Sequence, residues 1–200
     1  MRALSAQLLD PSNLCAVPES CTKSARTAAF RKPWNPFIPL DDKNSGIPCA
    51  ILEYTLHNTS SRAVDYEFSY HLSHLAPGCR PDQAASANAV IPGKGAFLFN
   101  REAPNAEGYG SASLTVIGGK PKIKAMWLRS PGWEFDSLSA LWREVSSGTF
   151  TTNDGSNTVD NAGRNGASIL LEGHLGTGES HTYSILITWR RRSDGIRQRQ

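Results

Sequence analysis

Long hydrophobic runs and paired cysteine motifs are missing from this 200-residue sequence. No stretch of about 18 apolar residues occurs, so the sequence predicts no membrane span. Residues 1–10 lack a long apolar segment, so no secretory signal is expected and a cytoplasmic location is predicted. The four cysteines form no Cys-x-x-Cys pair, which argues against a zinc site. Cys15 and Cys21 are near enough in sequence to pair, but free thiols in a reducing compartment are favoured.

Familiar catalytic and nucleotide-binding motifs are also missing. The sequence has no Gly-x-Ser-x-Gly elbow and no Gly-x-x-x-x-Gly-Lys-Ser/Thr loop. His71 and His74 look like a metal pair, but residues three apart on a strand point to opposite faces. We therefore interpret both as surface or edge histidines, and we predict no metal and no cofactor. No two carboxylates stand out as the facing pair that glycosidic chemistry needs. Asn58-Thr59-Ser60 matches the glycosylation acceptor pattern, which is common by chance.

Positive charge is scarce outside the C-terminus. The formal net charge is +3. Without its last ten or so residues the chain is near neutral or slightly acidic. A basic tail can bind nucleic acid or anionic lipid. No aromatic residue lies among these arginines, so base stacking is not indicated and we predict no nucleic-acid partner. We interpret residues 191–200 as a disordered basic tail. The arginines of this end are Arg190, Arg191, Arg192, Arg197 and Arg199.

Alternation of apolar and polar residues is the strongest pattern that the sequence does contain. Within residues 64–72, Val64, Tyr66, Phe68, Tyr70 and Leu72 occupy every second position. This period of two predicts a strand with one buried and one wet face. Residues 49–57 precede it across a short polar turn, so the two segments predict a hairpin. Further strands are expected at 87–91, 96–99, 111–117, 123–128, 168–171 and 181–189.

One segment has helical spacing instead. In residues 137–147, Leu138, Leu141, Trp142 and Val145 recur at helix spacing. Asp136 precedes the segment as an N-cap, and a glycine follows it as a C-cap. The chain is therefore predicted to be an all-β, antiparallel β-sandwich with one short helix. We expect an irregular lead-in over residues 1–30, the sandwich over 31–190, and the tail over 191–200.

A proline-bracketed segment, residues 34–42, interrupts this pattern. Two prolines forbid a regular helix there and disfavour a central strand. Its aromatic residues therefore become candidates for an exposed interface with a partner, because such interfaces favour large aromatics. Asp41 and Asp42 are weak candidates for ligand contact, although a turn role is favoured. The tryptophans are interpreted as core or interface residues rather than as a sugar-stacking platform. The candidates for the partner interface are Trp34, Pro36, Phe37 and Trp133.

The same segment carries a family resemblance. Pro-Phe-Ile-Pro-Leu-Asp-Asp-Lys-Asn-Ser-Gly-Ile-Pro at residues 36–48 resembles the N-terminal domain of glycoside hydrolase family 116. This is the non-lysosomal glucosylceramidase and β-glucosidase family. The motifs Asn58-Thr59-Ser60, Leu141-Trp142-Arg143-Glu144 and Gly178-Glu179-Ser180 follow in the family's order. The resemblance covers roughly residues 33–189.

The resemblance implies a supporting function that requires a catalytic partner. In the family the two catalytic carboxylates lie in a separate C-terminal helical barrel, which the sequence does not contain, so no catalytic residue carries over. The expected function is a non-catalytic sandwich that supports such a barrel in the same or a neighbouring chain. The parent substrate would be a β-glucoside or glycolipid. The alternatives are a free-standing carbohydrate-binding module and a small hydrolase with an unrecognised site.

Overall fold

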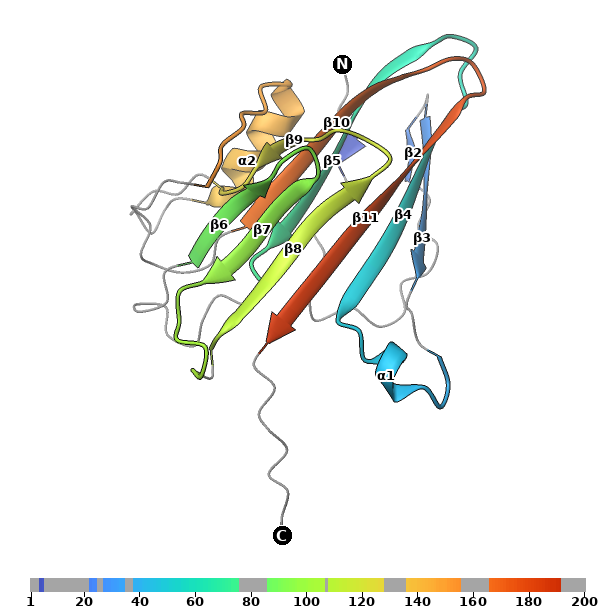
Figure 1. Ribbon diagram of the computed structural model, residues 1–200. Coiled ribbons are helices and arrows are strands. Elements are labelled where there is room, and N and C mark those ends of the chain that lie inside the picture. The colour runs from blue at the N-terminus through green and yellow to red at the C-terminus, as the bar shows by residue number, and fades with distance from the viewer. Residues whose placement is uncertain are drawn as a thin grey trace.

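The computed structural model describes two β-sheets, packed face to face, and two short helices. The described residues are 4–5, 22–24, 27–34, 38–75, 86–106, 108–127, 136–155 and 166–191. The seven-stranded sheet crosses the front of Figure 1, and the smaller sheet lies behind it. The predicted all-β sandwich is confirmed. Within the described residues, no helix is long and apolar enough to cross a membrane.

The larger sheet has the strand order β2-β3-β4-β11-β8-β7-β6, and all of its neighbours are antiparallel. Its strands are β2 (Thr22–Ser24), β3 (Thr27–Trp34), β4 (Cys49–Asn58), β6 (Ser86–Ile91), β7 (Gly95–Asn100), β8 (Gly110–Ile117) and β11 (Ser180–Arg191). The smaller sheet has the order β1-β5-β10-β9. Its strands are β1 (Leu4–Ser5), β5 (Val64–Ser73), β9 (Lys122–Lys124) and β10 (Gly166–Leu175). β1 pairs in parallel with β5, and the other pairs of this sheet are antiparallel.

The core lies between the two sheets, where the predicted alternation places it. Tyr66, Phe68, Tyr70 and Leu72 of β5 are all buried and face the larger sheet. The ring of Phe68 stacks on Tyr183 of β11, with a centroid distance of 5.6 Å. Aromatic contacts of this kind stabilise a fold beyond the area they bury. The core therefore fixes the smaller sheet against the larger one and determines which side chains face outward.

The longer helix packs on the smaller sheet from outside. α2 (Ser137–Ser147) begins and ends where the sequence predicts. The carboxylate of Asp136 accepts the backbone N–H of Leu138, and Gly148 ends the helix at φ 70°, a left-handed conformation that suits glycine. Leu141 and Val145 pack with Trp127 in a second, smaller cluster. This end of the outer face is therefore covered.

The described strands of the N-terminal part differ from the expected irregular lead-in. Residues 1–30 are not wholly irregular, because β1, β2 and the first half of β3 lie there. β3 forms by backbone pairing with β4, from Thr27 opposite Asn58 to Trp34 opposite Ile51, and its sequence shows no alternation. A second, short helix that the sequence did not predict, α1 (Asp42–Ser45), follows the proline-bracketed segment's Asp41.

Candidate functional site

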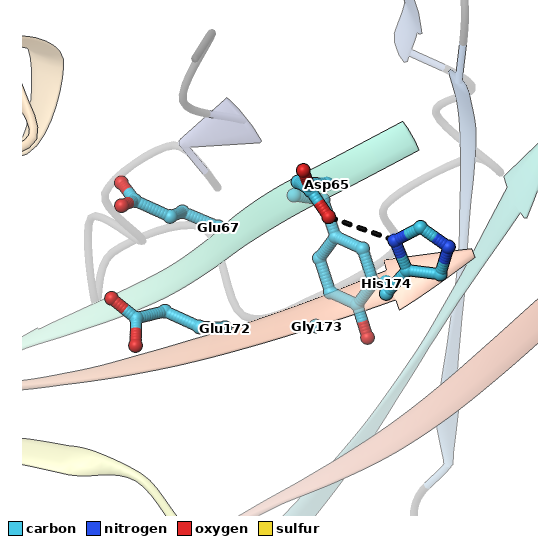
Figure 2. Close-up of a pocket in the computed structure, with 6 residues that line it drawn as sticks. Asp65, Glu67, Glu172, Gly173 and His174 are labelled. Carbon is cyan, nitrogen blue, oxygen red and sulfur yellow. Dashed lines mark hydrogen bonds and ion pairs between the residues drawn. The ribbon is translucent and has the colours of Figure 1, made fainter. Parts of the chain in front are cut away.

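A hollow of about 360 Å³ lies across β5 and β10 of the smaller sheet. Figure 2 shows the charged side chains that surround it, which come from both strands. The antiparallel register places Asp65 opposite His174, Tyr66 opposite Gly173, and Glu67 opposite Glu172. Directly opposite residues on neighbouring strands share one face of a sheet. The six lining residues are Asp65, Tyr66, Glu67, Glu172, Gly173 and His174.

The middle pair, Tyr66 and Gly173, faces the core between the sheets. Tyr66 is buried, and its hydroxyl lies 2.7 Å from the hydroxyl of Tyr183. Burial, followed by this hydrogen bond, raises the pKa of Tyr66, so the phenol stays protonated. A Cβ on residue 173 would lie 2.3 Å from the Tyr66 hydroxyl, so only glycine fits there. Because Tyr66 points inward, a ligand in solvent can contact only the charged pairs on either side of it, Asp65 with His174 and Glu67 with Glu172.

The charged pairs are open to water. The Nδ1 atom of His174 lies 2.8 Å from Oδ1 of Asp65, and both side chains are mostly exposed. The Nζ atom of Lys122 lies 2.5 Å from Oε1 of Glu172, with about half of each side chain exposed. Glu67 faces Glu172 across the strands. Exposed ion pairs contribute little to stability, so these groups are available to donate or accept hydrogen bonds with a polar ligand.

This geometry does not form a glycosidase centre. Such a centre needs two carboxylates across the scissile bond, one of them buried enough to act as an acid. Glu67 and Glu172 form the only directly opposed carboxylate pair in the hollow, but Glu172 is already engaged by Lys122 in an exposed position. Among the described residues, no group of three or more His, Cys, Asp and Glu side chains is placed to hold a metal ion.

A buried polar relay lies farther along the same two strands. His71 bonds the hydroxyl of Ser168 through Nδ1 at 2.8 Å and that of Ser69 through Nε2 at 3.1 Å. Trp127 donates its indole N–H to Ser168 at 2.7 Å. Ser168 is fully buried, so this Ser–His contact cannot meet a substrate. The relay is therefore structural.

The expectation that His71 and His74 are surface or edge histidines is wrong. Both side chains are buried. His71 does lie on the outward face of β5, but Trp127 covers this end of that face. His74 instead bonds the backbone carbonyl of Phe99 at 3.1 Å. Burial lowers the pKa of both residues, that of His71 to about 4.

Residues 23–192 match the family described as "beta-glucosidase 2, glycosyl-hydrolase family 116 N-term". The chain belongs to this family. The match includes every described strand of the domain except β1 and the first residue of β2, Thr22. The resemblance predicted from residues 36–48 is thereby confirmed.

Similar solved structures are more distant from this family 116 domain. A polysaccharide lyase is 13% identical with a TM-score of 0.48, over 88% of this chain and 22% of the lyase. An Escherichia coli K12 protein described as an aldose 1-epimerase is 9% identical with a TM-score of 0.40, over 88% of this chain and 69% of its own. A TPR-domain containing protein from Parabacteroides distasonis ATCC 8503 is 9% identical with a TM-score of 0.31, over 92% and 37%. No curated protein matches the sequence. These likenesses assign no substrate to the domain.

The predicted interface residues of the family 116 domain lie mostly outside the described residues. Trp34 is the last residue of β3 and pairs through its backbone with Ile51. Pro36, Phe37 and Trp133 fall in segments that the structure does not describe. Their place at an interface stays a prediction.

The two acidic candidates of the proline-bracketed segment sit at the start of α1. Asp41 is its N-cap and accepts the backbone N–H of Asn44 at 3.0 Å. That bond, with a second one from the Asn44 side chain, lowers the pKa of Asp41. Asp42 is the first helical residue. Asp41 thus caps α1, and ligand contact by either residue stays a prediction.

The glycosylation triplet of the domain is structural. Asn58 is fully buried, and its Nδ2 donates to the backbone carbonyls of Arg62, Leu175 and Gly176 at 2.8, 3.1 and 3.0 Å. It thereby joins the β4–β5 turn to the β10–β11 turn, which lie side by side in Figure 1. An amide in this position is not accessible to a glycosylating enzyme.

Proposed function

We propose that this chain is the non-catalytic N-terminal β-sandwich of a family 116 β-glucosidase. It supports a helical-barrel catalytic domain, located in the same or a neighbouring chain. The family match over residues 23–192 carries this proposal, because it assigns most of the chain to the N-terminal domain of that family. The parent substrate is a β-glucoside or glycolipid, and the site of action is cytoplasmic.

The charged hollow supports the non-catalytic part of the proposal. The Glu67–Glu172 pair lies on an open sheet face, and one member is ion-paired with Lys122. An acid catalyst needs an apolar environment that keeps its proton at neutral pH, and an open face in water does not provide one. The hollow can contact polar groups, but it does not meet the requirements for bond cleavage.

Hydrolysis of an aryl β-glucoside by the purified chain tests this point. We expect no turnover above the uncatalysed rate. Turnover that is abolished by Glu67→Gln or Glu172→Gln, but not by Glu53→Gln on the other sheet, would instead assign catalysis to the hollow.

The support function is tested with a separately expressed helical-barrel domain of a family 116 β-glucosidase. We expect the chain to form a complex with the barrel and to increase its β-glucosidase activity in a concentration-dependent manner. Trp34→Ser combined with Phe37→Ser should weaken the complex without lowering the melting temperature. If this double variant unfolds, the two residues belong to the core and the predicted partner face is wrong. If the unmodified chain neither binds nor activates the barrel at micromolar concentration, the support function is wrong.

A further inference from the structure

The outward face of the larger sheet is rich in hydroxyl groups. On β8 and β11, the side chains that alternate with the buried core residues are mostly serine and threonine, whereas β4 adds Thr55 beside Ile51, Glu53 and His57. Several of them bond one another across the strands, with Thr55 and Thr182 2.8 Å apart and Ser113 and Thr188 2.7 Å apart. These residues are Thr55, Ser111, Ser113, Thr115, Thr182, Ser184 and Thr188. The part of this face on β8 and on the neighbouring residues of β11 carries mainly uncharged hydroxyls, which offer many donors and acceptors to an uncharged polar ligand.

Two phenylalanines stand beside these hydroxyls on β7. Leu98 between them is fully buried, so Phe97 and Phe99 both point outward. Their rings stack with a centroid distance of 5.4 Å and an interplanar angle of 25°. Phe97 remains 38% exposed, which is unusual for a large apolar side chain on a sheet face. Stacking holds the two rings in one orientation, so the accessible aromatic surface is already ordered before any ligand binds.

The neighbours of Phe97 leave its ring accessible. Ala89 of β6 is directly opposite on one side, and Ser113 of β8 is directly opposite on the other. Both side chains are too short to cover a phenyl ring. The next outward row places Ser111 opposite Phe99 and Arg190 opposite Ser111. Arg190 is exposed, and no ion pair within the described part of the chain engages it.

We propose that the Phe97–Phe99 pair and the adjoining row on β8 and β11 form a binding site for the sugar rings of an uncharged β-linked glucan. A pyranose ring has a face of C–H groups that packs on an aromatic ring, while its hydroxyls point outward around the edge. The Ser113–Thr188 pair uses one hydroxyl hydrogen in its mutual bond and keeps the other available. Arg190 adds guanidinium donors at the end of the row. The choice of glucose as the sugar rests on the proposed function, whereas the site itself rests on this geometry.

The site is separate from the charged hollow, which lies on the other sheet. A site on this open face holds a substrate chain without cleaving it, and so deepens the accessory role proposed above. Binding is expected to be weak, because a shallow face covers only one side of the sugar.

Titration calorimetry of the full chain with cellohexaose and laminarihexaose tests the proposal. We expect saturable binding of at least one of the two glucans. Phe97→Ala should weaken that binding at least tenfold, whereas Phe97→Tyr should retain it. Ile117→Ala is the matched control, because Ile117 is an exposed apolar residue of the same sheet at the far end of β8, and its loss should leave affinity unchanged. Ser113→Ala should weaken binding about threefold.

The variants also distinguish a glucan-binding site from a protein interface. Phe97→Ala removes the stack on Phe99 and should lower the melting temperature by only a few degrees, about 3 °C, and circular dichroism verifies that the variant stays folded. Binding of neither glucan by the folded chain overturns the proposal, as does equal affinity of Phe97→Ala and the unmodified chain. If Phe97→Ala instead abolishes concentration-dependent self-association and no glucan binds, the face is a protein interface. Activation of the barrel domain is measured independently, so failure of this site leaves the support function testable on its own.

Discussion

The indole N–H of Trp127 donates to the hydroxyl of Ser168, and the same hydroxyl is hydrogen-bonded to Nδ1 of His71. An indole nitrogen only donates, so Ser168 accepts from Trp127, and its oxygen lies 2.8 Å from Nδ1 of His71. The other ring nitrogen, Nε2, bonds the hydroxyl of Ser69. These bonds join β5 to β10, and burial favours the neutral form of the imidazole.

The first prediction is that acid weakens the fold through His71. Burial lowers the pKa of His71 from 6.5 to about 4, so between these values the unfolded chain binds a proton that the folded chain does not. Stability rises with pH where the unfolded state binds more protons, so His71 should reduce the free energy of unfolding by about 3 kcal/mol from pH 7 to pH 4. Urea unfolding across this range measures the slope. His71→Gln should flatten it, whereas His174→Gln, at an exposed position, should not. An unchanged slope in His71→Gln would contradict the assignment.

The second prediction compares two ion pairs of neighbouring lysines. Lys124 is only 4% exposed and bonds Glu144 of α2 at 2.7 Å, whereas Lys122 and Glu172 are each about half exposed. Glu144→Gln leaves a buried ammonium without its counter-charge and should lower the free energy of unfolding by about 3 kcal/mol. Glu172→Gln should cost less than about 1 kcal/mol, because water screens that pair. Chemical denaturation of both variants gives the difference. Equal losses would mean that burial of Lys124 does not determine the energetics.

The third prediction concerns the turn amide of Asn58. Asn58→Asp replaces a buried N–H donor with a carboxylate that faces three backbone carbonyls, those of Arg62, Leu175 and Gly176. The loss should be about 3 kcal/mol or more, because buried acceptors become unsatisfied and a charge is left unpaired. Thr59→Ala, at the exposed next position, should change stability by less than about 0.5 kcal/mol. A chain secreted through a glycosylating pathway should also carry no glycan at Asn58. Glycan attachment there, detected by mass spectrometry, would show that the turn opens.

Local patterns predicted the parts of the fold that depend on neighbouring residues. The alternation over residues 64–72 and the capped helix α2 each show in a short stretch, since side-chain spacing and caps are local. β3 was not predicted, because its pairing with β4 compensates for a sequence without alternation and with Pro33 inside it. β2 pairs only with residues 27–29 of β3, so the part of β3 around Pro33 has no second described neighbour. Pro33 is tolerated there because its missing N–H is not needed for pairing on that side.

The candidate sites depend on register, which the sequence does not reveal. Glu67 faces Glu172, and Phe97 lies between Ala89 and Ser113, only because of how distant strands align. The burial of His71 likewise depends on Trp127, which is far from it in sequence. The sequence did contain one sign of the aromatic pair, since Phe97 and Phe99 flank a leucine at every second position, but it did not indicate which face they occupy.

The last prediction concerns Leu40, whose backbone has a φ of 68°. A leucine in this left-handed region is strained by about 1–2 kcal/mol, because its Cβ crowds the backbone. Its side chain is fully exposed, so packing does not compensate. The loop is held instead by Ser45, which bonds both the N–H and the carbonyl of Ile38, and by the Asp41 cap. Leu40→Gly removes the crowding and should raise the free energy of unfolding by about 1 kcal/mol, or the melting temperature by about 3 °C.

Leu40→Ala provides the matched control for this prediction. Alanine retains a Cβ and therefore the strain, so its melting temperature should stay near that of the unmodified chain. Both variants remove an exposed apolar side chain from a segment in which Ile38 and Ile47 are also about half exposed. Both should therefore bind less of a hydrophobic dye, since such dyes bind exposed apolar surface. Equal melting temperatures of the glycine and alanine variants would mean that residue 40 is not strained. Unchanged dye binding in both would mean that the exposed apolar surface of the chain lies elsewhere, with Leu138 and Trp142 of α2 as the next exposed candidates.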